Sequence, residues 1–200
     1  HASMPIGAYS EKHIMPENKL VPVPDGVSAE VASCVTLKGI TAEYLLHRAY
    51  PLKKGDKVLY HAAAGALGQI LCPWANSIGA EIIGTVGSKE KEEIAKKNGC
   101  HHVINYTDKN FVEEVEKIVG KNGIDVVYDG VDLKTFEGSI EVLKIRGMMV
   151  AFGNASGYVD TIDVKKHINA KGLFFTRPSI AHYTIEREEL LESAKKVFDA

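Results

Sequence analysis

The sequence predicts an α/β fold, a doubly wound parallel sheet, and two observations favour it. Short, largely apolar runs alternate with longer segments whose apolar residues recur every three or four positions. Strands of a parallel sheet are buried on both faces and show such runs, while the connecting helices cover the sheet. The second observation is a run of small residues, 62–68, between the first strand and the first helix of this alternation.

The strands follow from apolar runs bounded by turn residues. They are expected at 57–61, 81–86, 103–105, 125–129, 147–152 and, as a candidate sixth, 173–176. Three helices between them are expected at 67–78, closed by Gly79, at 89–98, capped by Ser88, and at 110–119. A fourth helical stripe joins Leu133, Phe136, Ile140 and Leu143. Thr184 is expected to cap a last helix with Leu190, Leu191, Ala194, Val197 and Phe198 on its inner side.

The first residues have a different character. Residues 1–3 are expected to be a cloning scar. Residues 4–36 are rich in proline and irregular, with a short helix from a cap at Ser28 through Ala32, and are expected to be the edge of a neighbouring domain. A separate helix from Lys38 should end before Pro51. The main domain is therefore expected to span 37–200.

Composition excludes several classes of function. With 45% hydrophobic residues, 25% charged residues and a net charge of −2, the chain is typical of a globular protein without attraction to nucleic acid or membrane surfaces. No apolar run approaches the ~20 residues of a membrane helix. The three cysteines form no CxxC pair, which favours a reducing, cytoplasmic setting. The histidines form no ligand cluster, so no metal site is expected.

The small-residue run begins at His61 and ends at Gly68. Small side chains let the backbone approach a pyrophosphate, and the N–H groups at a helix start favour an anion. Ala63, Gly65 and Gly68 stand at the three glycine positions of the dinucleotide fingerprint. The run alone fits a tight turn equally well. Its place in the strand–helix alternation predicts a Rossmann-type dinucleotide domain.

The end of the second strand indicates which dinucleotide binds. Sites that prefer NAD place a carboxylate there for the ribose 2′-hydroxyl. This chain has Gly87 and Ser88, followed by Lys91. A hydroxyl and a lysine suit a 2′-phosphate, so NADP(H) is expected. The alternative is that Ser88 caps a helix and Lys91 is a solvated helix residue. These structural roles and the phosphate contacts can coexist.

Two further strand ends are candidates for the site. Phe152, Gly153 and Asn154 end the fifth strand, where backbone groups could contact a nicotinamide. Asp129 ends the fourth strand, where a cofactor contact and a plain turn residue are equally favoured.

The strings HAAAGALG, GTVGSKEK, VINY, VVYDGV, MVAFGNASG and FTRPS resemble the quinone oxidoreductases related to zeta-crystallin, in the medium-chain dehydrogenase/reductase superfamily. The resemblance runs from about Gly7 to the end of the chain. It implies a Rossmann domain beside a GroES-like catalytic domain, of which 4–36 would be a remnant. It also implies a truncation that removes most of that domain and a carboxyl-terminal return.

The same resemblance implies the cofactor-binding residues. The pyrophosphate would lie on Ala64, Gly65, Ala66 and Leu67. The 2′-phosphate and adenosine would lie near Gly87, Ser88, Lys91 and Tyr106. The nicotinamide would lie near Thr41, Phe152, Gly153 and Asn154, in a pocket closed by Thr176 and Arg177. Ala66 replaces a glycine common in the family, which is tolerated if its φ is negative.

For activity, the resemblance implies reduction of quinones or other α,β-unsaturated carbonyls by direct hydride transfer from NADPH, without a side-chain general acid. Leu37, where zinc-dependent relatives have a cysteine ligand, implies a zinc-free site. A homodimer through the sheet edge at 173–176 is expected. An NADPH-binding module without turnover, which is favoured for this chain, an enoyl reductase and a purely structural domain remain alternatives.

Overall fold

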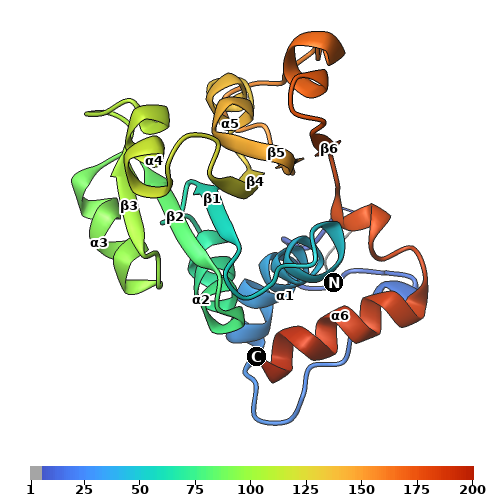
Figure 1. Cartoon of the computed structure of the whole chain (residues 1–200). Coiled ribbons are helices and arrows are strands. Elements are labelled where there is room, and N and C mark those ends of the chain that lie inside the picture. The colour runs from blue at the N-terminus through green and yellow to red at the C-terminus, as the bar shows by residue number, and fades with distance from the viewer. Residues whose placement is uncertain (1–5) are drawn as a thin grey trace. The chain divides into compact units, whose positions relative to one another are not determined.

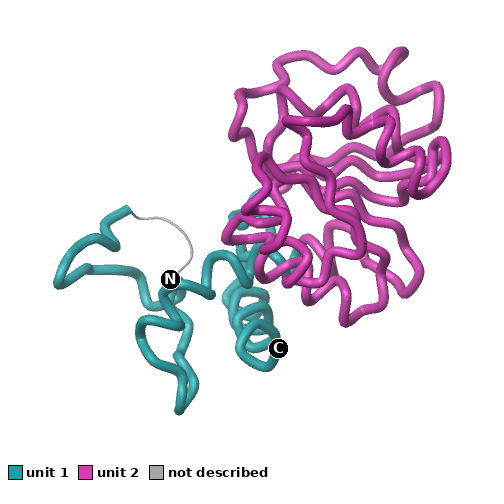
Figure 2. The backbone as a smooth tube through the Cα atoms, turned by 90° about the vertical axis from the view of Figure 1, so that its left-hand side faces the viewer, with its two compact units in different colours: residues 1–44, 179–200 teal, residues 45–178 magenta. Residues whose placement is uncertain are grey.

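The computed structural model describes residues 6–200, so the expected cloning scar lies outside the described residues. The chain forms two compact units (Figure 2). The sheet unit is 45–178, and the helical unit is 6–44 together with 179–200. The boundary expected after residue 36 refers to the domains of full-length relatives, and it stays a prediction.

The sheet unit is built on six parallel strands in the order β3-β2-β1-β4-β5-β6 (Figure 1). The strands are β1 Lys57–His61, β2 Glu81–Val86, β3 His102–Asn105, β4 Ile124–Asp129, β5 Leu143–Ala151 and β6 Phe174–Thr176. This is the Rossmann order, in which ligands bind beyond the carboxyl ends of the strands, where the winding reverses between β1 and β4. The predicted fold class is confirmed.

Four α-helices connect these strands: α2 Gly68–Ile78, α3 Lys89–Lys97, α4 Phe111–Val119 and α5 Phe136–Val142. Helix α2 packs on α3, and α4 packs on α5. Right-handed crossovers place the two pairs on opposite faces of the sheet. The π-helical segments η2 Leu45–Ala49 and η3 Val164–Asn169 complete the helices of this unit.

A large hydrophobic cluster lies between the sheet and the α4–α5 layer. It joins strand side chains to helix side chains, among them Leu59, Ile83, Val127, Met149, Val115, Phe136 and Ile140. Each fully buried side chain of this kind contributes about 1.5–3 kcal/mol. A shift of one residue in a strand would turn this set away from the helices, so the cluster fixes the register.

The fourth predicted helical stripe is wrong at both ends. Leu133 is exposed and precedes α5, which begins at Phe136, and Leu143 begins β5. The reason is the turn after β4. Asp132 has a φ of 71°, and the N–H groups of Leu133 and Lys134 donate to the Gly157 carbonyl and to Ser156 Oγ in the loop after β5, so Leu133 lies in the turn that precedes the helix.

Helix α6 in the helical unit spans Arg187–Asp199, and its predicted cap at Thr184 is wrong. The Thr184 hydroxyl donates to the carbonyl of Ile180 instead, at 2.9 Å. Glu186 is the cap, and its side chain and that of Glu189 form a capping box. The helical unit also contains the short segments η1 Glu17–Lys19 and η4 Ile180–His182.

One continuous helix, α1 Ala29–Tyr44, replaces the two helices expected before the first strand. The hydroxyls of Ser33 and Thr36 donate to carbonyls of the preceding turn, so these residues do not interrupt it. Helices α1 and α6 pack closely, since a Cβ at Gly39 would lie 2.3 Å from Val197. No helix within residues 6–200 is long and apolar enough to span a membrane.

Candidate functional site

The loop 62–67 joins β1 to α2 at the carboxyl end of the sheet. A Cβ at Gly68 would lie 2.2 Å from the Ala63 carbonyl oxygen, so only glycine lets the helix begin this close to the loop. Gly65 donates its N–H to the Ala62 carbonyl at 2.9 Å, which closes a tight turn. Gln69, Ile70 and Leu71 donate their N–H groups to the carbonyls of Gly65 and Leu67. No side chain caps α2, and among the described residues no acceptor meets the N–H groups of 66–68, so these three are available to an anion.

Ala66 replaces a glycine of the family pattern, and its φ is negative, as an alanine at this position requires. Among the described residues other than glycine, positive φ angles occur at Ala62, Asn122, Asp132 and Arg146, and Ala66 does not share them. Ala62, with φ of 61°, takes the left-handed conformation at the start of the loop instead.

Gly87, Ser88, Lys91 and Tyr106 come together at the ends of β2 and β3. The Tyr106 hydroxyl lies over Gly87, where a Cβ would approach its oxygen to 2.6 Å. Ser88 caps α3, since its Oγ accepts the N–H of Lys91 at 3.4 Å. A capping hydroxyl uses a lone pair and keeps its proton to donate, so the cap does not exclude a phosphate contact. Lys91 is exposed.

Phe152, Gly153 and Asn154 follow β5 beside the end of β4. A Cβ at Gly153 would lie 2.7 Å from the Gly130 carbonyl oxygen, so the two strand ends meet backbone to backbone. The Phe152 ring stacks on Tyr60 with centroids 6.2 Å apart. Asn154 is exposed, and its carbonyl accepts the N–H of Gly157 at 3.1 Å.

Thr176 ends β6, and Arg177 follows it. Arg177 Nη1 donates to Asp132 Oδ2 at 2.8 Å, and Nη2 approaches the Gly153 carbonyl oxygen at 3.4 Å. The structure thus brings together Arg177 and Gly153, which were both predicted on the nicotinamide side of the site. Thr41 lies in the helical unit, on α1, where its hydroxyl donates to the Leu37 carbonyl at 2.8 Å. Its role stays a prediction.

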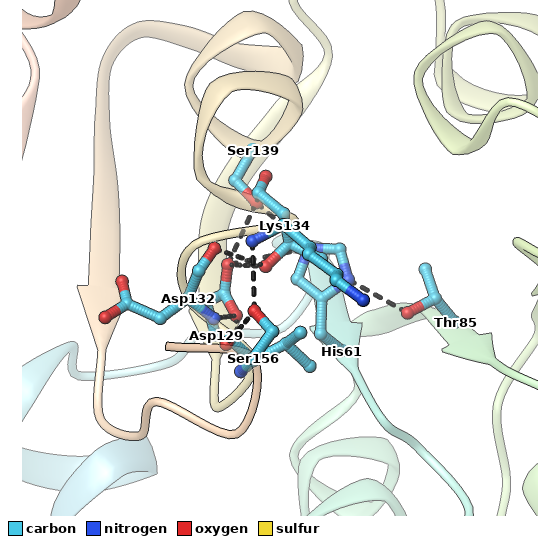
Figure 3. A network of polar contacts seen from close by, with 9 residues as sticks. His61, Thr85, Asp129, Asp132, Lys134, Ser139 and Ser156 are labelled. Carbon is cyan, nitrogen blue, oxygen red and sulfur yellow. Dashed lines mark hydrogen bonds and ion pairs between the residues drawn. The ribbon is translucent and has the colours of Figure 1, made fainter. Parts of the chain in front are cut away.

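A buried polar network lies behind these loops, and the sequence did not indicate it (Figure 3). His61, fully buried at the end of β1, bonds Thr85 Oγ1 through Nδ1 and Ser139 Oγ through Nε2, both at 2.9 Å. Ser139 Oγ also lies 3.2 Å from Asp129 Oδ2. The network therefore links the residue before the loop 62–67 to β2, β4 and α5.

Asp129 is a turn residue. Its Oδ1 accepts the N–H groups of Val131 and Asp132 at 2.8 and 2.9 Å, and its Oδ2 accepts the Thr135 hydroxyl at 2.7 Å. Since these contacts occupy a carboxylate that is 0% exposed, the structure favours the turn over the cofactor contact.

Burial lowers the pKa of His61 below its usual value, because desolvation disfavours the charged imidazolium. The Asp129 carboxylate, 3.9 Å from Nε2, acts in the opposite direction with a smaller effect. His61 therefore serves as a neutral hydrogen-bonding group at neutral pH.

A cavity of 510 Å³ opens among the loops that follow β1, β3, β4 and β5. Its lining combines apolar walls, hydroxyl and amide groups, and two lysines: Ala62, Tyr106, Lys109, Asn110, Phe111, Val131, Lys134, Thr135, Ala155 and Ser156. No carboxylate lines it, so the cavity favours an anionic ligand with a flat, partly apolar part. Within residues 6–200, no group of three or more His, Cys, Asp or Glu side chains could hold a metal ion.

The comparisons with known proteins agree with this geometry. The sequence pattern of the family described as "Zinc-binding dehydrogenase" matches residues 66–198. The chain is 46% identical to a 2-haloacrylate reductase of a Burkholderia species, over 98% of this chain and 60% of that protein. It is 44% identical to a quinone oxidoreductase of Salmonella typhimurium, over 99% of this chain and 61% of that protein.

A solved structure extends the similarity to three dimensions. The Escherichia coli quinone oxidoreductase, solved in complex with NADPH, superposes with a TM-score of 0.85 at 42% identity, over 88% of this chain and 54% of that one. The chain thus spans about 60% of the length of the curated relatives it matches.

Proposed function

The chain belongs to the zinc-binding dehydrogenase family, and on that premise we propose that it is the NADP(H)-binding part of an oxidoreductase. The proposed reaction is NADPH-dependent reduction of quinones or related α,β-unsaturated carbonyls by direct hydride transfer. The observation that supports it most is the loop 62–67 with the uncapped start of α2, beside a cavity that two lysines line.

The residues present fit NADP(H). The N–H groups of 66–68 would hold the pyrophosphate. Ser88 and Lys91 would hold the 2′-phosphate, because Gly87 and Ser88, which follow β2, carry no carboxylate to repel it. The apolar walls of the cavity and Tyr106 suit the adenosine. The similarity to an enzyme solved with NADPH supports this choice.

On the nicotinamide side, the backbone of 152–154 and the segment at Thr176 would orient the ring. The cofactor, when bound, supplies the hydride. The protein's own part is to hold the ring, to exclude water and to present one of its faces to the acceptor. No side chain of this chain is assigned as a general acid.

The acceptor class rests on the relatives. Quinones and 2-haloacrylate, for which these relatives are named, both contain an electron-poor conjugated double bond that can accept a hydride. The reaction is proposed to be independent of zinc, supported by Leu37 at the position of a cysteine ligand in zinc-dependent relatives. A cytoplasmic location and a homodimer through the β6 edge, where Phe174 is 57% exposed, complete the proposal.

The direct test is oxidation of NADPH with a benzoquinone, a naphthoquinone and a simple enone as acceptors, in the presence and absence of a chelator. Turnover that the chelator does not change supports the proposal. Binding of NADPH without turnover of any acceptor would favour a binding module, and turnover confined to thioester-linked enoyl substrates would favour an enoyl reductase.

A further inference from the structure

Asp132 has an unusual place in the sheet unit. It lies in the turn between β4 and α5 with φ of 71°, and it is 1% exposed. Non-glycine residues rarely adopt this conformation unless their surroundings hold them there. Here the Asp132 N–H donates to Asp129, and the Asp132 carbonyl accepts from Thr135 and Phe136.

The Asp132 carboxylate joins three loops at the carboxyl edge of the sheet. Its Oδ2 accepts Arg177 Nη1 at 2.8 Å and the Val159 N–H at 3.4 Å. The Arg177 guanidinium also lies 4.9 Å from the centre of the Tyr158 ring, and it donates to the Gly153 carbonyl. One ion pair thus connects the turn after β4, the loop after β5 and the end of β6.

The pair constrains what Arg177 can do. A buried carboxylate without a cation is strongly unfavourable, because the desolvated charge keeps no compensating partner. If Arg177 swung away to a phosphate, Asp132 would be left in that state. Arg177 is therefore held in place more firmly than its exposed position suggests.

We propose that Asp132 and Arg177 are positioning residues that fix Gly153 and Thr176 at the nicotinamide end of the site, and that the Arg177 guanidinium does not bind the cofactor phosphates. This inference rests on the proposed binding of NADP(H). It adds Asp132, which the sequence did not single out, and it changes the expected role of Arg177 from ligand contact to support.

The test is a set of variants titrated with NADPH, with NADH and with 2′,5′-ADP, which lacks the nicotinamide half. Arg177→Met removes the charge and keeps the stem. Asp132→Asn keeps an acceptor oxygen for Val159. The double variant leaves no unpaired charge and covers the case in which Arg177→Met, which leaves the buried Asp132 carboxylate without its cation, fails to fold. Arg146→Met, at an exposed position of β5, is the control.

We expect Arg177→Met and Asp132→Asn to weaken NADPH and NADH by the same factor, about 5- to 20-fold, with 2′,5′-ADP changed by less than about twofold. The double variant should match Arg177→Met alone, since both changes break one contact. The control should bind like the wild type.

Two results would overturn the inference. One is a loss on Arg177→Met that is much larger for NADPH or 2′,5′-ADP than for NADH, with Asp132→Asn unchanged or tighter, because Arg177 would then bind a phosphate. The other is additive losses in the double variant. If the wild-type chain bound neither NADPH nor 2′,5′-ADP, the proposed function would fail, and the inference with it.

Discussion

The two halves of the sheet's carboxyl edge are built differently. Beyond β1, β2 and β3, the site consists of backbone groups and small or exposed residues, as in the loop 62–67 and at Ser88. Beyond β4, β5 and β6, buried charged side chains, Asp129 and Asp132, tie the loops together. The first half offers N–H groups of the loop, Ser88 and Lys91 to a ligand, whereas in the second half the carboxylates are used internally and Lys134 is the cation that lines the cavity.

The largest expected effect tests the backbone-built half. Gly68→Ala should destabilise the fold by about 2–3 kcal/mol and abolish dinucleotide binding, because its Cβ would lie 2.2 Å from the Ala63 carbonyl oxygen. Urea unfolding and NADPH titration measure the two effects. Gly65→Ala, whose Cβ would lie 3.1 Å from the Ala62 carbonyl oxygen, is the milder control. Equal stability of the two variants would contradict the close approach.

The second prediction moves to the opposite edge of the sheet, where α5 ends and β5 begins, and tests whether a side chain also ties the chain together there. Lys171 Nζ donates to the carbonyls of Ile140, Glu141 and Leu143 at the end of α5. Lys171→Met should cost about 1–3 kcal/mol, because it leaves these carbonyls without their donor. Lys165→Met, at an exposed position of η3, should cost much less. If urea unfolding showed no difference between them, the lysine would not be a structural cap.

The third prediction concerns pH. Burial lowers the pKa of His61 below 6.5, so the unfolded state takes up the proton first as the pH falls. Stability should be complete above about pH 6.5 and fall below it toward the lowered native pKa, by at most about 1.4 kcal/mol per pH unit from this residue. His61→Asn should be less stable at neutral pH but show a shallower loss between pH 6.5 and 5. An unchanged slope would exclude His61 as the source.

The smallest effect concerns the cavity. Lys134→Gln should weaken NADPH binding about three- to fivefold and reduce its salt dependence, because one cation fewer faces an anionic ligand. Lys117→Gln is the matched control, since this exposed lysine pairs with Glu114 and does not line the cavity. If the two variants bound NADPH with equal affinity, the cavity would not be part of the cofactor site.

The sequence predicted the backbone-built half well, because its signals are local. The apolar runs at 57–61 and 81–86 match β1 and β2, and Ser88 caps α3 as expected. The side-chain network could not be predicted. His61 meets Ser139 across 78 positions, and Asp132 meets Arg177 across 45, so both contacts depend on strand order and register.

Errors at element ends have the same origin. Threonine is a common helix-cap residue, but the Thr184 hydroxyl donates to the Ile180 carbonyl, and Glu186 caps α6 instead. The start of α5 is set by contacts of Asp129 and Asp132, which the apolar spacing around Leu133 does not reveal. Local propensity thus locates the elements, while buried polar contacts decide where they begin.

The central claim is that the first half of the edge holds a 2′-phosphate. Titration of the chain with NADPH and with NADH, each also against Lys91→Ala and its neighbour Lys89→Ala as control, tests it most directly. We expect NADPH to bind at least about tenfold more tightly than NADH, and Lys91→Ala to remove most of that difference while Lys89→Ala keeps it. Equal affinities for NADPH and NADH in the wild type, or tighter binding of NADH, would contradict the account.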